Sequence, residues 1–245
     1  MSDIIKYRPE IDGLRTIAVT SVILFHAEFS LSGKNIVAGG YLGVDVFFVI
    51  SGYLITSIIL RSLDNQSFSF LNFYERRARR ILPILLTVML ATLPLAWTVL
   101  YPQELKEYAN SLLYSTFFSS NFWFFSEDPY WAADSSLKPF LHTWSLAVEE
   151  QFYFIMPVLL VGLNKYAKKA LLPVLSVILF SSLVLANWAS DEYPQFSFYM
   201  LPTRMWELLA GTILAVLEVR RGRTIGLNSY GILSALGIVL ICAPG

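Results

Sequence analysis

Long apolar runs separated by short polar segments make up most of the chain. A helix of about 20 apolar residues crosses the ~30 Å hydrocarbon core of a bilayer, and several runs have this length. The short alternating segments typical of a membrane β-barrel are missing from these runs. The pattern therefore predicts an all-α, polytopic bundle of about seven to eight transmembrane helices. The predicted spans are residues 14–32, 40–61, 81–101, 140–163, 170–189, 200–219 and 229–244.

Segment 108–125, "YANSLLYSTFFSSNFWFF", has a mixed character. Its Ser and Asn residues disfavour the membrane interior, and its aromatic end suits the interface. Lys and Arg concentrate before the first span, between residues 61 and 80, and at 165–169 and 220–223. These basic segments share the cytoplasmic side only if 108–125 does not cross the membrane. We therefore expect it to lie in the outer interface or to re-enter, with a cytoplasmic N-terminus and residues 102–139 outside.

The composition is typical of a membrane protein and gives no support for some classes of partner. Hydrophobic residues make up 56% of the chain, charged residues 15%, and the mean hydropathy is +0.57. A formal net charge of zero gives no reason to expect a nucleic-acid partner. The single cysteine excludes an intrachain disulfide framework. We expect one domain over residues 1–245 that begins with an uncleaved helix and is incomplete at its C-terminus.

The largely apolar stretch "IDGLRTIAVTSVILFHAE" carries Arg15 near one end and His26 near the other. Arg15 and His26 are eleven residues apart. At about 100° and 1.5 Å per residue they lie on nearly one face of a helix, roughly 16 Å apart along its axis. Ionisable groups inside a membrane span are candidates for function, and a neutral imidazole acts as a base or relay near pH 7. His26 is therefore the leading candidate for chemistry.

A second group of ionisable residues lies in "FLHTWSLAVEEQFYF". His142 and Glu149 are two helical turns apart and share a face, with Glu150 beside them. A structural role for this histidine is the competing interpretation, and the sequence leaves Glu149 and Glu150 undecided. Arg204 and Glu207 are three residues apart, and we interpret them as a structural pair on one helix surface.

Four arginines, Arg76, Arg77, Arg79 and Arg80, stand in "FYERRARRILP", immediately before a predicted span. One interpretation is a topology signal that also anchors lipid headgroups. The other is a binding site for a phosphate-rich cytosolic molecule, because the planar guanidinium binds phosphate through two parallel hydrogen bonds. The glycines of residues 39–55 indicate close helix packing.

Four stretches, taken in order, resemble acyltransferase family 3, whose membrane proteins acylate cell-surface and secreted glycans. The details are most similar to the subgroup in which a periplasmic SGNH hydrolase-like domain follows the membrane domain. The resemblance implies a multi-pass protein of the bacterial inner membrane. The stretches are "YRPEIDGLRTIAV", "GGYLGVDVFFVISGYLI", "FYERRARRILP" and "LKPFLHTWSLAVEEQFYF".

The resemblance also implies substrates and site residues. The donor is a cytoplasmic acyl-coenzyme A, expected to be acetyl-coenzyme A, and no metal is expected. The acceptor is a carbohydrate hydroxyl, such as one of lipopolysaccharide O-antigen. Further partners are the bilayer and a fused or separate SGNH domain. Arg15 and His26 match the family's essential pair, and residues 76–80 contain its Arg-x-x-Arg motif in two registers, 76/79 and 77/80.

These observations combine into one mechanistic hypothesis. The basic segment and Arg15 bind the phosphates of the coenzyme, whose pantetheine arm reaches His26. His26 then deprotonates the acceptor hydroxyl or carries the acyl group transiently. Glu149 or Glu150 orients the imidazole ring, and His142 belongs to the acceptor side. The competing classes are a proton-coupled transporter or exporter and a structural membrane subunit.

Overall fold

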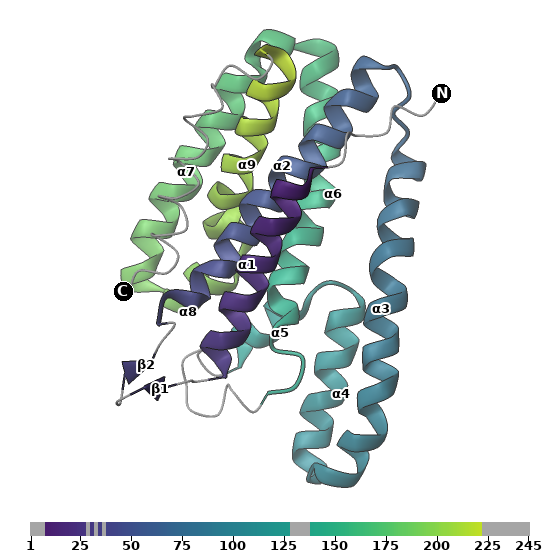
Figure 1. Cartoon of the computed structure of the whole chain (residues 1–245), viewed down its shortest axis with the longest axis vertical. Helices are drawn as coiled ribbons and strands as arrows, with labels where there is room; N and C mark the ends of the chain where they lie inside the picture. Colours follow the sequence, from purple (N-terminus) through teal and green to yellow (C-terminus); the bar gives the residue numbers. More distant parts are fainter. Residues whose placement is uncertain (1–7, 28–29, 32–33, 36–37, 128–137, 222–245) are drawn as a thin grey trace. The chain divides into compact units, whose positions relative to one another are not determined.

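The computed structural model describes most of the chain, drawn in Figure 1. The predicted span 229–244 lies outside the described residues. Helices dominate the part that is described, which confirms the all-α prediction. The chain divides into two compact units, Met1–Arg61 with Glu207–Gly245, and Ser62–Trp206. The described residues are 8–27, 30–31, 34–35, 38–127 and 138–221.

In its described part, the first unit contains three long helices and a short hairpin. Strands β1 and β2 pair in antiparallel fashion, with Ser30 opposite Asn35. Helix α1 packs against the 3-10 helix η1, which leads directly into α2. Helix α9 contributes its residues from Glu207 onward to this unit. The bounds are α1 Pro9–His26, β1 Ser30–Leu31, β2 Lys34–Asn35, η1 Ala38–Leu42, α2 Gly43–Asp64 and α9 Leu201–Arg221.

The second unit is built around α6. Helices α4, α5, α7 and α8 all pack against α6, and α3 packs lengthwise against α4 (Figure 1). An apolar core between α3 and α4 contains Leu85, Met89 and Tyr108. The bounds are α3 Phe70–Val99, α4 Pro102–Thr116, α5 Ser120–Ser126, α6 Thr143–Tyr166, η3 Lys168–Ala170, α7 Leu171–Glu192 and α8 Pro194–Tyr199.

Five helical segments within the described residues are long and apolar enough to cross a membrane. They correspond to five of the spans predicted from the sequence, those that begin at residues 40, 81, 140, 170 and 200. This is the character of a multi-pass membrane protein. The five segments are Gly39–Asp64, Phe70–Val99, Thr143–Tyr166, Lys168–Glu192 and Pro194–Arg220.

The bounds predicted for the first helix were wrong. The structure has a helix over Pro9–His26 instead of 14–32. The helix begins earlier because proline suits its first turn, and because the acidic Glu10 and Asp12 complement the positive end of the helix dipole. These charges also leave α1 less apolar than the five candidate spans. That α1 crosses the membrane therefore stays a prediction, as does the cytoplasmic side of the N-terminus.

Helix α3 also begins earlier than the predicted span 81–101. Its first residue is Phe70, and the side chain of Ser69 accepts a hydrogen bond from the backbone N–H of Asn72, 3.5 Å away. The four arginines therefore lie on the helix and not in a loop before it, which corrects the sequence-based interpretation. At 1.5 Å per residue α3 is about 45 Å long, which exceeds the ~30 Å apolar core of a bilayer.

Segment 108–125 forms parts of two helices and no single long one. Helix α4 ends at Thr116 and α5 begins at Ser120. Between them, Phe118 has a φ of 51°, in the left-handed region that interrupts a helix. With 15 and 7 residues, α4 and α5 are each shorter than the roughly 20 residues that cross a bilayer. The placement of this segment in the outer interface stays a prediction.

Candidate active site

Arg15 and His26 lie on the same helix, as their spacing predicts. His26 is the last residue of α1, and its side chain is exposed. Its Nδ1 lies 2.9 Å from the carbonyl oxygen of Val22, one turn earlier. A carbonyl oxygen only accepts hydrogen bonds, so this contact requires the proton on Nδ1. In the neutral ring the lone pair is then on Nε2, which is the form that a general base or acyl acceptor needs.

Arg15 is half-buried near the start of the same helix. Its guanidinium lies 3.9 Å from the carboxylate of Asp12, three residues earlier. Such surface pairs contribute about 0.5 kcal/mol or less. The Asp12 contact is therefore weak enough for a stronger anion, such as a phosphate, to replace it.

The second half of α1, which ends at His26, packs closely against Gly40 and Gly43. A Cβ on Gly43 would lie 2.5 Å from the carbonyl oxygen of Ala18 and 2.7 Å from the Ser21 hydroxyl. Gly40 makes a similarly close approach to the carbonyl oxygen of Ser21. Only glycine permits such contact, as in other tightly packed membrane helices. The prediction that these glycines serve packing is confirmed.

Helices α2 and α9 form a similarly close pair. A Cβ on Gly52 would collide with the carbonyl oxygen of Leu208, and one on Gly211 would collide with the backbone of α2. Next to this contact the fully buried hydroxyls of Thr56 and Thr212 are hydrogen-bonded at 3.0 Å. The two backbones therefore cannot slide past each other without losing both the fit and the hydrogen bond.

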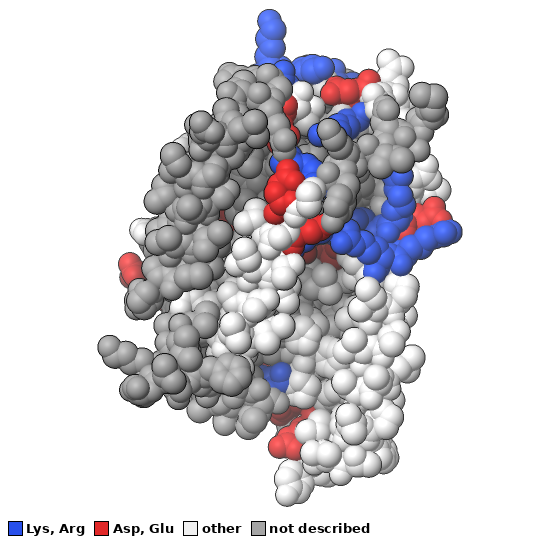
Figure 2. Space-filling view, viewed as in Figure 1, with Lys and Arg blue, Asp and Glu red and all other residues white. Residues whose placement is uncertain are grey.

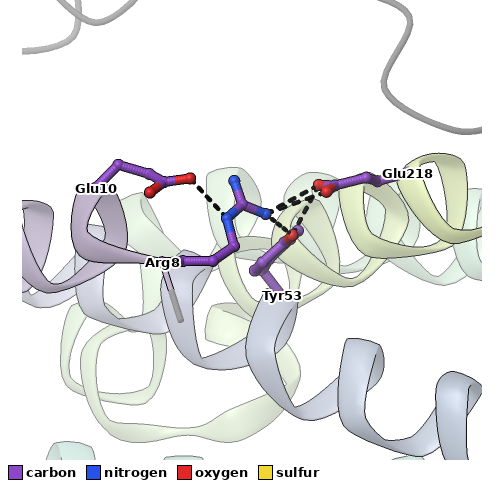
Figure 3. Close-up of polar contacts among 4 residues, drawn as sticks. All are labelled: Arg8, Glu10, Tyr53 and Glu218. Carbon is purple, nitrogen blue, oxygen red and sulfur yellow. Dashed lines mark hydrogen bonds and ion pairs between the residues drawn. The ribbon is translucent and has the colours of Figure 1, made fainter. Parts of the chain in front are cut away.

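A polar cluster that the sequence analysis did not find joins Arg8 to both of these helices (Figure 3). The Arg8 Nη1 donates to the Tyr53 hydroxyl of α2 and to the Glu218 carboxylate of α9, 3.1 Å away. The Tyr53 hydroxyl donates to Glu218 Oε2 at 2.7 Å, and Arg8 Nε donates to Glu10 at 2.7 Å. No short motif could reveal this cluster, because its members are 45 and 165 residues apart.

The charges of this cluster make it a poor phosphate site. One guanidinium faces the two carboxylates of Glu10 and Glu218, which leaves a net negative charge that repels another anion. Burial lowers the pKa of Arg8, but the hydrogen bond from Arg8 to Glu10 and the charge of Glu218 raise it, and the net direction is upward. Arg8 therefore stays charged and bound to its partners.

In the second unit, Arg77 links α3 to α6. Its Nη2 donates to Glu150 at 3.0 Å, and its guanidinium carbon lies 3.9 Å from the centre of the Tyr153 ring. The Arg77 and Glu150 side chains are only 19% and 14% exposed. The carboxylate of Glu150, considered in the sequence analysis as an orienting group for His26, thus binds an arginine of its own unit.

The other three arginines of α3 are exposed, and Figure 2 shows basic side chains gathered over the N-terminal part of this helix. Arg79 is 79% exposed and lies 2.6 Å from Glu75. Arg76 and Arg80 are one helical turn apart on one face, and neither has a hydrogen bond or ion pair within the described residues. Each register of the Arg-x-x-Arg motif thus contains one arginine with an acidic partner and one without.

His142 lies just before α6. The span predicted from residue 140 would have placed it inside the helix. The helix starts at Thr143 because Phe140 has a φ of 63°, in the left-handed region. The carbonyl oxygen of Phe140 accepts hydrogen bonds from the backbone N–H and the hydroxyl of Thr143, at 2.9 and 2.7 Å. The exposed imidazole of His142 stacks on the Phe140 ring at 6.0 Å, and Glu149 follows two turns later on α6.

Comparison with known proteins identifies the family. The model of acyltransferase family 3, described as an acyltransferase domain, matches residues 8–245. The chain belongs to acyltransferase family 3. This confirms the resemblance noted in the sequence, and the matched region includes every site residue described above.

Two relatives of this family 3 chain carry informative names. Peptidoglycan O-acetyltransferase OatA of Listeria monocytogenes is 36% identical over 253 residues, which cover 97% of the chain and 40% of the relative. The Bacillus subtilis protein named "Putative peptidoglycan O-acetyltransferase YrhL" is 39% identical over 218 residues, covering 86% of the chain and 33% of the relative. The family 3 chain therefore spans less than half the length of these curated relatives. No solved structure matches it.

Proposed function

We propose that this chain is the membrane part of an O-acyltransferase that moves an acetyl group from acetyl-coenzyme A to a hydroxyl of peptidoglycan. Membership of acyltransferase family 3 and the printed names of both relatives support the reaction class. The names also favour peptidoglycan over the lipopolysaccharide acceptor expected from the sequence. The observation that carries the proposal is His26 at the end of α1, with its Nδ1 proton held by the Val22 carbonyl oxygen.

The proposed chemistry uses the lone pair of His26 Nε2. In direct transfer, Nε2 takes the proton of the sugar hydroxyl while the hydroxyl oxygen forms a bond to the thioester carbon. The carbon–sulfur bond then breaks, and the coenzyme thiolate takes the proton back from the imidazolium. In the two-step alternative, Nε2 attacks the thioester carbon and the coenzyme leaves as a thiolate. The sugar hydroxyl then attacks the acetyl-imidazolium, which releases the imidazole, and the hydroxyl proton passes to the thiolate. Both routes need the Nδ1-protonated, neutral ring.

The donor would be held at its phosphates by arginines. Arg76 and Arg80 carry no acidic partner within the described residues and share one face of α3, so they are our candidates for this contact. Arg15 is the third candidate, because its bond to Asp12 is long and weak. Arg77 instead holds α3 against α6 through Glu150.

The experiment follows radiolabelled acetyl-coenzyme A into the cell wall, using membranes that contain the full-length protein. We expect label in peptidoglycan with the wild-type protein and none with His26→Ala at equal protein level. Ile23→Ala is the matched control, because this α1 side chain is 61% exposed and makes no polar contact. Separating the glycans before counting distinguishes peptidoglycan from another acceptor. Label that His26→Ala leaves unchanged would refute the role of His26.

A further inference from the structure

Helix α1 is attached to its unit at two separate places. Its second half contacts Gly40 and Gly43 through the backbone. Its beginning is held by the side chain of Arg8, the residue that immediately precedes the helix. The first attachment is steric and the second is ionic. Together they determine where the helix lies along its axis and how it is rotated.

Tyr53 and Glu218, which accept hydrogen bonds from Arg8, lie on the tightly packed helices α2 and α9. Tyr53 directly follows Gly52, which touches α9. Glu218 comes seven residues, or two helical turns, after Gly211, which touches α2, so Gly211 and Glu218 share a face of α9. The polar cluster therefore continues the seam along which the two backbones meet. A displacement of Tyr53 or Glu218 would require that seam to open.

Arg8, Tyr53 and Glu218 form a closed ring of hydrogen bonds (Figure 3). Arg8 donates to the other two, and Tyr53 donates to Glu218. The Tyr53 side chain is buried, so its hydroxyl needs a partner, and the ring supplies both a donor and an acceptor. Removing Arg8 or Glu218 leaves the opposite charge partly buried without its ion-pair partner in this ring, which costs more than the bond itself.

We propose that this ring is a positioning clamp for α1, and through α1 for the donor-binding Arg15. This inference rests on the proposed acetyl transfer. Arg8 precedes Arg15 by seven residues, so both lie on one side of the chain about 10 Å apart along the axis. Arg8 precedes His26 by eighteen residues, about 27 Å, which is too far for it to touch the reacting atoms. The ring acts through α1 and not on the substrate.

The positions along α1 predict a specific kinetic signature. Loss of the ring frees the beginning of α1, which leads to Arg15, whereas the contact of Gly40 with Ser21 and Phe25 still holds the end that carries His26. The KM for acetyl-coenzyme A should therefore rise while kcat changes little. A purely structural role would instead lower the amount of folded enzyme, which reduces the maximal rate and leaves KM unchanged.

The experiment measures both constants in membranes containing the full-length protein. We expect Glu218→Gln, Tyr53→Phe and Arg8→Ala each to raise the KM for acetyl-coenzyme A about tenfold, which is the size of the loss of one hydrogen bond to a charged group. Arg8→Lys keeps a cation facing both Glu10 and Glu218 and should retain most of the affinity. Asp64→Asn, which removes an exposed charge from the end of α2, is the matched control.

Two results would overturn the clamp. One is a normal KM in Glu218→Gln, Tyr53→Phe and Arg8→Ala alike, and the other is a KM in Arg8→Lys as high as in Arg8→Ala. If the wild-type protein transfers no acetyl group, the proposed function is wrong. The attachment of α1 by the ring can then still be tested by amide hydrogen exchange, which needs no activity. Faster exchange in the first turns of α1 in Glu218→Gln, but not in Asp64→Asn, supports it, and unchanged exchange refutes it.

Discussion

Replacement of Gly43 by alanine separates the position of α1 from the chemistry of its side chains. The new methyl group would lie 2.5 Å from the carbonyl oxygen of Ala18 and 2.7 Å from Val22 Cγ2. Ordinary contacts begin at 3.4 Å, so the backbone of α1 must move away by about 0.9 Å. A backbone carbonyl cannot rotate aside as a flexible side chain can. The whole turn that leads to His26 must therefore shift.

This shift has a calculable cost in activity. Misplacement of a catalytic group by 1 Å lowers the rate up to about 100-fold. We expect Gly43→Ala to lower kcat by up to about 100-fold and also to raise the KM for acetyl-coenzyme A. Both constants change because Ala18 lies one turn after Arg15 and Val22 one turn before His26. Overpacking should also lower the free energy of unfolding by about 1–3 kcal/mol. The loss of activity should therefore exceed what a small loss of folded protein explains.

Gly13→Ala is the matched control on the same helix. Among the residues that the structure describes, none comes within 4 Å of a Cβ at Gly13, so alanine fits against them without any shift. Alanine also favours a helix over glycine by about 0.8–1.0 kcal/mol. We expect normal activity and equal or higher stability. The assay is acetyl transfer to peptidoglycan over a range of donor concentrations, with thermal unfolding in detergent alongside. Full kcat in a folded Gly43→Ala protein would refute the link between the position of α1 and catalysis.

The arginines of α3 provide two further predictions. Arg76→Ala and Arg80→Ala should each raise the KM for acetyl-coenzyme A about tenfold through the loss of a phosphate contact, whereas Arg79→Ala, at an exposed surface pair, should change it less than about twofold. An unchanged KM in both of the first variants would exclude them from the donor site. Arg77→Ala should lower the free energy of unfolding by about 3 kcal/mol, because it leaves the carboxylate of Glu150 buried without its cation. Thermal unfolding in detergent tests this, and Arg77→Met with Glu150→Leu should recover most of the loss.

The sequence was most informative where one physical signal dominates. Apolar runs of about 20 residues predicted the central parts of five long helices, because length and hydrophobicity alone select a membrane-crossing helix. Helix ends were predicted less well. Hydropathy placed the start of α3 at residue 81, whereas the hydrogen bond from Asn72 to Ser69 begins the helix at Phe70. The same signal missed the first turn of α1, because charged residues lower hydropathy without preventing a helix.

The candidate site shows the same division between local and distant information. The spacing of Arg15 and His26 predicted one helix with two functional side chains, and that prediction needed only helical periodicity. The four arginines near residue 80 looked equivalent in the sequence. Their difference comes from partners at different distances along the chain, since Arg77 binds Glu150, 73 residues later, and Arg79 binds Glu75 on its own helix. Helical periodicity can predict the pair of Arg79 and Glu75, which are four residues apart, but not the pair of Arg77 and Glu150.

The ring of Arg8, Tyr53 and Glu218 marks the limit of sequence reasoning for this chain. Each member has an ordinary local explanation, since Arg8 precedes a helix, Tyr53 lies in an apolar run and Glu218 ends another. Their meeting depends on the glycine contacts that bring α2 and α9 together and on the packing of α1. Local spacing thus predicts which side chains α1 carries, whereas tertiary packing determines where α1 presents them. The KM effect expected for Glu218→Gln tests the ionic attachment of α1, and the kcat effect expected for Gly43→Ala tests the steric one.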